Sequence, residues 1–128
     1  MKMYTASLQH LTKLRKAYSD YLFVSIARGK NCNKQCDVSY TKLAPTWELL
    51  EAYNNGTVTW EHYEMNYNSY LAELSPHTVF AELKTIALNT NKKAIVLVCY
   101  EKYNTHCHRR LVAEWYNKLG CNVKELNY

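Results

Sequence analysis

The chain has 128 residues, a length that predicts a single domain spanning residues 1–128. Hydrophobic residues make up 48% of the sequence and charged residues 21%, which is ordinary for a globular protein and excludes intrinsic disorder. The three glycines are widely separated, which excludes glycine-rich nucleotide loops, and the net charge of +5 suits an anionic partner without requiring one.

Apolar segments that read as strands alternate along the chain with segments of helical periodicity. We expect strands over residues 2–6, 21–26, 93–99 and 122–126, with the strongly apolar third strand at the centre of the sheet. Helices are expected over residues 8–18, 46–53, 60–74, 76–86 and 107–119, whereas residues 28–40 show no periodicity and are expected to form a loop. Ser75 and Pro76 form a helix start signal, and Gly56 and Gly120 are helix stop signals. Alternation of this kind predicts an α/β fold with a parallel sheet.

Ligands of open parallel sheets bind beyond the carboxyl ends of the strands. Three turns fall there, at residues 5–7, 25–29 and 99–109. Arg28 and Arg109 stand in two of them, and the third runs into the amino terminus of a helix, which favours anions. The sequence therefore predicts an anion site at this edge of the sheet.

The helix over residues 107–119 separates three basic side chains. If Leu111, Trp115 and Leu119 face the core, His108 points inward along the same line and Arg109 lies beside it. Arg110 falls on the opposite, solvated side. His108 is then either a site residue or a hydrogen-bonded core histidine, and the helical spacing does not decide between them.

Five cysteines without a secretion signal indicate reduced thiols rather than a disulfide framework. Cys107 stands at a helix amino terminus beside His108, a position that favours the thiolate, and Cys99 ends a buried strand. Either thiol is a candidate nucleophile, although an inert buried cysteine is the commoner state.

Some of the cysteines are also candidate metal ligands. Cys32 and Cys36 together with Cys107 and His108 supply four zinc-ligand side chains, but their spacing departs from zinc-binding patterns. We therefore expect no metal and no cofactor, and an exposed loop around Cys32 and Cys36.

The order of the turns resembles that of the DUF488 family. The matching segments are Tyr4-Thr5, Ser25-Ile26-Ala27-Arg28-Gly29, Tyr40 with Leu43-Ala44-Pro45, Trp60 with Tyr63, Cys99-Tyr100-Glu101-Lys102, and Cys107-His108-Arg109 with Leu111-Val112-Ala113. The resemblance covers nearly the whole chain and implies one Rossmann-like, three-layer α/β domain: a small, mostly parallel sheet with helices on both faces. It implies no function. Asn31 to Cys36 depart from the aromatic-rich loop of the family, and Tyr103 stands where a proline is common.

Three functions follow as hypotheses. The first is binding of a small anionic, nucleotide-like ligand, in one version as a phage-type sponge that sequesters a nucleotide immune signal. The expected contacts, which include loop tyrosines able to stack a base, are Thr5, Ser25, Arg28, Tyr40, Tyr100, Glu101, Lys102, His108 and Arg109.

The second hypothesis is an enzyme for a nucleotide or another phosphorylated or carboxylated substrate. His108 acts there as acid or base and Cys99 or Cys107 as nucleophile. The third is nucleic-acid binding, which ranks lower because the basic residues are scattered.

No signal peptide or membrane segment is recognisable, so we expect a cytoplasmic protein. The sequence leaves open whether the protein forms a homo-oligomer.

Overall fold

In a computed structural model, which describes residues 1–100 and 106–127, the chain folds around a five-stranded sheet whose strands all run parallel. The strand order is β3-β2-β4-β1-β5, so the apolar strand β4 lies at the centre, as predicted. The strands are β1 (Lys2–Ser7), β2 (Tyr21–Ser25), β3 (Val38–Ser39), β4 (Ala94–Cys99) and β5 (Lys124–Glu125).

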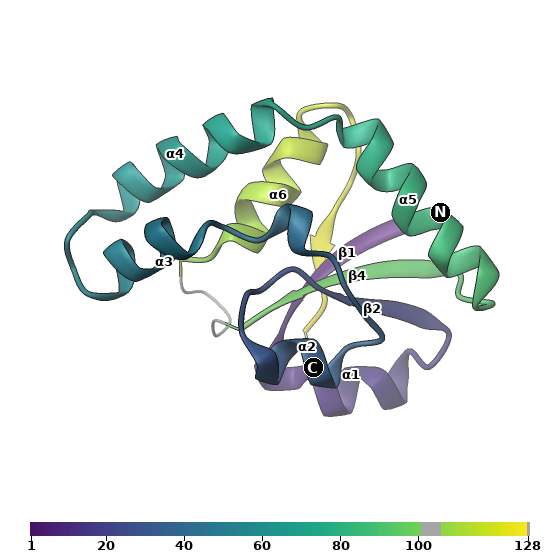
Figure 1. Cartoon of the computed structure of the whole chain (residues 1–128). Coiled ribbons are helices and arrows are strands. Elements are labelled where there is room, and N and C mark those ends of the chain that lie inside the picture. Colours follow the sequence, from purple (N-terminus) through teal and green to yellow (C-terminus); the bar gives the residue numbers. More distant parts are fainter. Residues whose placement is uncertain (101–105, 128) are drawn as a thin grey trace.

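Helices cover both faces of this sheet. Figure 1 shows α1 and α2 below the strands, and α5 and α6 above them, with α3 and α4 on the same side as α6. The helices are α1 (Leu11–Ala17), α2 (Lys30–Gln35), α3 (Trp47–Asn54), α4 (Trp60–Ala72), α5 (Pro76–Asn89) and α6 (His108–Asn117), with two short turns, η1 (Leu8–His10) and η2 (Thr41–Leu43). The predicted Rossmann-like α/β fold is confirmed.

The helix ends follow from local side-chain chemistry. Thr46, Thr59 and Ser75 accept hydrogen bonds from backbone N–H groups of the first turns of α3, α4 and α5. After α3 and α6, Gly56 and Gly120 adopt φ angles of +80° and +89°, a conformation that favours glycine. The signals read from the sequence therefore mark true helix boundaries.

The prediction of a loop over residues 28–40 is wrong, because this segment contains α2 and β3. Both elements are short, and two strand residues leave no periodic signal. Cys32 on α2 is fully buried, which corrects the expectation of an exposed loop at this cysteine. Asp37 anchors the segment to β2, since its carboxylate accepts a hydrogen bond of 2.8 Å from the Phe23 N–H.

The connections that leave the neighbouring strands β1 and β4 lead toward opposite edges of the sheet. The connection that leaves β1 runs through α1 to β2, whereas the one that leaves β4 runs past β1 to β5 through α6 on the opposite face (Figure 1). Ser7 and Cys99 end these two strands side by side. Open α/β sheets bind ligands at such a switch point.

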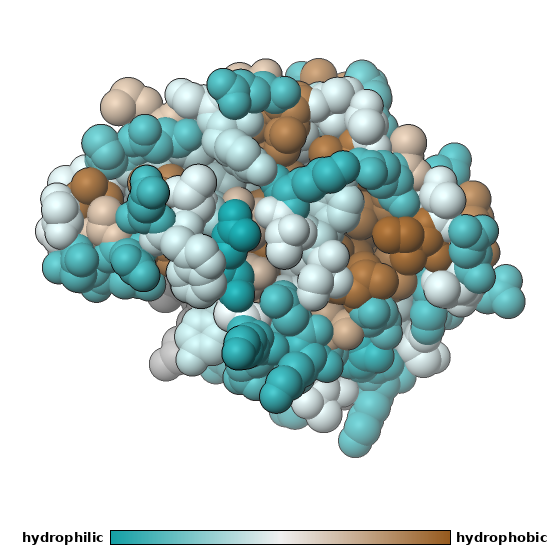
Figure 2. All heavy atoms as spheres, viewed as in Figure 1, coloured by the Kyte–Doolittle hydropathy of each residue, from teal (hydrophilic) through white to brown (hydrophobic). Residues whose placement is uncertain are grey.

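The surface reflects the same layering. Figure 2 shows hydrophilic residues over α1 and α2, and hydrophobic residues grouped beside α5, where it covers the sheet. Within residues 1–100 and 106–127, no helix has both the length and the apolar character needed to cross a membrane.

Candidate functional site

Two cysteines and a histidine meet at the switch point. Cys99 is the last residue of β4, Cys107 is the N-cap residue of α6, and His108 is the first residue of that helix. Sulfur and imidazole nitrogen atoms of the three residues lie within 4.8 Å of one another, and all three residues are buried. We refer to Cys99, Cys107 and His108 as the Cys-Cys-His cluster.

The hydrogen bonding of His108 fixes its tautomer. Nε2 lies 2.6 Å from the Ile26 carbonyl oxygen, which can only accept, so Nε2 carries the proton. Nδ1 is then unprotonated, and it lies 3.7 Å from Cys107 Sγ. Burial, above all other causes, lowers the pKa of His108 to about 4, so the imidazole is neutral at pH 7. The prediction that His108 points inward is confirmed.

The structure pairs Cys99 with Cys107 as a disulfide, and their Cα atoms lie 7.6 Å apart. This corrects the expectation that all cysteines are reduced. Cys32, Cys36 and Cys121 do not form a disulfide. No local sequence pattern predicts this pairing of Cys99 with Cys107, because it depends on the end of β4 and the start of α6 meeting in space.

Arg109, expected from the sequence to contact the ligand, lies inside the protein with partners of its own. It is fully buried: its Nε and Nη2 donate to the two carboxylate oxygens of Glu125 at 2.7 and 3.0 Å, and its Nη1 donates to Cys99 Sγ at 3.2 Å. Glu125 also accepts a hydrogen bond of 3.0 Å from Thr5. With its guanidinium committed in this way, Arg109 is a poor candidate for the predicted ligand contact.

The buried face of α6 also differs from the predicted one, because it includes Arg109, which pairs with Glu125. Val112 and Tyr116 face the core beside Arg109, whereas Leu119 is 52% exposed and Trp115 is half-buried. An arginine enters this face because Glu125 neutralises it. Burial would raise the pKa of Glu125, but the hydrogen bond and charge of Arg109 outweigh it and lower that pKa. Sequence reasoning missed Glu125, since nothing local to β5 shows what it pairs with.

Other predicted contacts already have partners inside the protein. Ser25 Oγ donates to Asn33 Oδ1 at 2.6 Å, and Tyr40 donates to Glu82 at 2.6 Å. Thr5 is committed to Glu125. Tyr100 is 65% exposed and remains accessible. The predicted contacts Glu101 and Lys102 lie outside the described residues.

Arg28 differs from these residues. Its Nε donates to the Pro45 carbonyl oxygen at 2.7 Å, and its two terminal nitrogens have no partner within the described part of the chain. The backbone just before it is held against the cluster, because the Ile26 N–H donates to Val98 at 2.9 Å and the Ile26 carbonyl accepts from His108. Arg28 thus presents N–H donors at the predicted edge.

Cys32 and Cys36 do not join the Cys-Cys-His cluster. Ser25 Oγ lies 3.3 Å from Cys32 Sγ, and the Cys32 thiol is directed at the Val98 carbonyl. A hydrogen bond with Cys32, together with burial, raises the pKa of the Cys36 thiol, which keeps it protonated. The four-ligand zinc site considered from the sequence is therefore not assembled.

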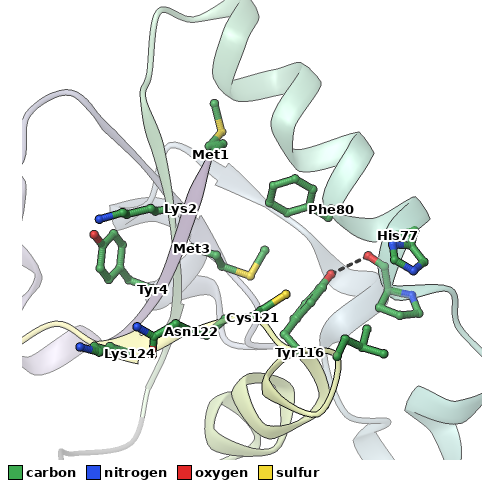
Figure 3. A pocket seen from close by; sticks show the side chains of 13 residues that line it. Met1, Lys2, Met3, Tyr4, His77, Phe80, Tyr116, Cys121, Asn122 and Lys124 are labelled. Atoms are coloured by element: carbon green, nitrogen blue, oxygen red, sulfur yellow. Dashed lines mark hydrogen bonds between the residues drawn. The ribbon is translucent and has the colours of Figure 1, made fainter.

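An apolar hollow of the described surface lies elsewhere. It has a volume of about 450 Å³ and is bordered by the first half of β1, the start of α5 and the end of α6. Figure 3 shows Met3, Phe80 and Tyr116 directed toward it, with Tyr116 donating to the Pro76 carbonyl oxygen. It lies away from the strand ends that carry the cluster.

A comparison with known protein families identifies the family that the sequence motifs resemble. Residues 4–120 match the family model DUF488-N3a, described as the active DUF488-N3 subclade. The chain belongs to this family. The DUF488 match spans β1 to α6, and so includes every member of the Cys-Cys-His cluster. No curated protein and no solved structure shows a significant match to the chain.

Proposed function

We propose that the chain binds a small anionic, nucleotide-like ligand at the carboxyl edge of its sheet. The observation that carries this proposal is the state of Arg28. Its Nε is held by the Pro45 carbonyl, while its terminal nitrogens have no partner among the described residues. A guanidinium fixed on one side offers its remaining N–H groups to phosphate or carboxylate in a set orientation.

Two further features of this edge support the proposal. The first-turn N–H groups of α6 give the edge a positive partial charge. Tyr100 directly follows Cys99 and is exposed, so its ring is free to stack on a flat base. A ligand that offers an anionic group to Arg28 and a flat ring to Tyr100 is a nucleotide-like molecule. In the phage-type sponge version, a cytoplasmic protein binds such a signal tightly and does not turn it over.

The ligand is identified by denaturing the purified protein and analysing the released small molecules by mass spectrometry. Titrations of the identified molecule at low and high salt then test the nucleic-acid alternative. Binding to a nucleic-acid backbone weakens steeply with salt, whereas binding of a small ligand in a partly buried site changes much less.

Arg28→Ala is expected to weaken binding of the identified ligand by about 10–100-fold, because it removes a charge-assisted hydrogen bond worth roughly 1.5–3 kcal/mol. Lys30→Ala is the matched control, since Lys30 is exposed two residues further along. Calorimetric titration of both variants measures the difference. Equal affinity of the Arg28→Ala variant and the wild type contradicts the proposal.

A second candidate function is catalysis on the same class of ligand. It is favoured by the 3.7 Å separation of Cys107 Sγ from the unprotonated Nδ1 of His108, which places an acceptor for the thiol proton next to the sulfur. The description of the family as active is consistent with this candidate.

Incubation of the reduced protein with the identified ligand separates the two candidates. If the chain only binds, the ligand is recovered unchanged, and Cys99→Ser and Cys107→Ser retain most of the affinity because a serine preserves shape and backbone. Chromatography of the recovered ligand is the measurement. A new product formed by the wild type, and absent with either serine variant, establishes the enzyme.

A further inference from the structure

The donor atoms of the Cys-Cys-His cluster match the ligand set of zinc. Two sulfurs and an imidazole nitrogen lie within 4.8 Å of one another in a buried setting. Thiolate and imidazole ligands select Zn²⁺ among common divalent cations, whereas Mg²⁺ and Ca²⁺ prefer oxygen ligands. We propose that the reduced protein binds one Zn²⁺ ion through Cys99, Cys107 and His108. This inference goes beyond the proposed function and does not depend on Arg28.

His108 is already arranged as a metal-ligating histidine. Such a histidine donates its other ring N–H to a carboxylate or a backbone carbonyl, which fixes the tautomer and the ring orientation. Here Nε2–H donates to the Ile26 carbonyl at 2.6 Å, so the free electron pair of Nδ1 faces Cys107 Sγ. No rearrangement of the ring is needed for Nδ1 to bind a metal.

The surroundings of Cys99 favour a thiolate. Arg109 Nη1 donates to Cys99 Sγ at 3.2 Å, and a donor of this kind stabilises negative charge on sulfur. Glu125 neutralises Arg109, and two thiolates neutralise Zn²⁺. The Arg109–Glu125 pair and the zinc ion with its two thiolates are then each without net charge, which keeps the cost of desolvation low.

The backbone spacing also suits a bridging ion. The Cα atoms of Cys99 and Cys107 are 7.6 Å apart, wider than the roughly 4.4–6.8 Å of most disulfides. A zinc ion with two Zn–S bonds of about 2.3 Å spans a wider gap between two cysteines than a direct S–S bond. On binding, each thiol releases its proton to solvent and no electrons are transferred.

Three protein ligands leave a fourth position of tetrahedral zinc for water or a ligand, as in catalytic rather than structural sites. The cluster lies at the edge where Arg28 presents its free donors. Zinc binding by the Arg28→Ala variant is nevertheless expected to equal that of the wild type, which separates failure of this inference from failure of the proposed function.

The full chain is purified with a phosphine reductant and without chelator, and its metal content is measured by mass spectrometry. We expect one zinc per chain, and after removal and replacement by Co²⁺ the intense visible bands of a tetrahedral, sulfur-ligated ion. Cys99→Ser, Cys107→Ser and His108→Asn are each expected to weaken zinc binding by more than the roughly 10–100-fold typical of changes around the ligands. Cys121→Ser is the control, since Cys121 is exposed and lies outside the cluster.

Alkylation of the wild type keeps the test informative if a variant does not fold. Zinc is expected to protect Cys99 and Cys107 from alkylation while Cys121 reacts, and a chelator is expected to remove that protection. Reduced wild-type protein that takes up neither zinc nor cobalt overturns the proposal. So does stoichiometric metal that survives unchanged in all three cluster variants.

Discussion

Arg109→Ala is expected to lower the free energy of unfolding by roughly 3–5 kcal/mol, the usual effect of removing one partner of a buried ion pair. Arg109 is fully buried and uses both sides of its guanidinium, on Glu125 and on Cys99. The substitution leaves the Glu125 carboxylate without its counter-ion and opens a cavity beneath α6. Denaturant unfolding followed by circular dichroism measures the change. A loss of this size is a large part of the stability of a small domain.

Arg110→Ala provides the matched control on the same turn of α6. Arg110 is half-buried and acts on Glu125 through its charge without the short contacts that Arg109 makes, so we expect a smaller loss than for Arg109→Ala, about 1 kcal/mol or less. Similar losses for the two variants contradict the assignment of Arg109 to the interior. A stable Arg109→Ala protein that has lost only ligand binding instead restores the contact first predicted from the sequence.

The parts of the fold that were predictable carry strong local signals. The six residues of β4 are all buried, and a continuous apolar run of this kind belongs to the centre of a parallel sheet. Ser75 caps α5 and Pro76 is its first residue because both residue types suit the backbone there. The buried stripe of Tyr63, Tyr67 and Leu71 on α4 follows from helical spacing alone.

The parts that were missed depend on pairing in space. β3 is held by two residues of β2, and two residues are too few for a periodic pattern. Arg109 looks like a surface or ligand-binding residue until Glu125, sixteen positions away, is brought against it. Sequence therefore located the carboxyl edge and the inward direction of His108, but not which charged groups satisfy one another there.

The stability of Glu125→Gln is expected to depend on pH in a defined direction. Glutamine keeps the shape of the side chain but removes the charge that neutralises Arg109. Glu125 is slightly exposed, so at pH 7 we expect a loss near the lower end of the roughly 3–5 kcal/mol found when a buried pair is broken. The control is Glu114→Gln, an exposed position on α6, the helix that carries Arg109; it is expected to change stability by less than about 0.5 kcal/mol.

The sign of the pH effect follows from the pKa of Glu125. Burial would raise that pKa, but Arg109, the Thr5 hydroxyl and the charge of Arg110 together lower it below its ordinary value of 4.5 in the folded protein. The carboxylate therefore contributes its full stability above that ordinary value and loses it as the pH falls through the lower, folded pKa. The advantage of the wild type over Glu125→Gln should shrink as unfolding is repeated from about pH 7 down to about pH 3. An advantage that stays constant or grows on acidification shows that Glu125 does not hold Arg109 as a charged pair.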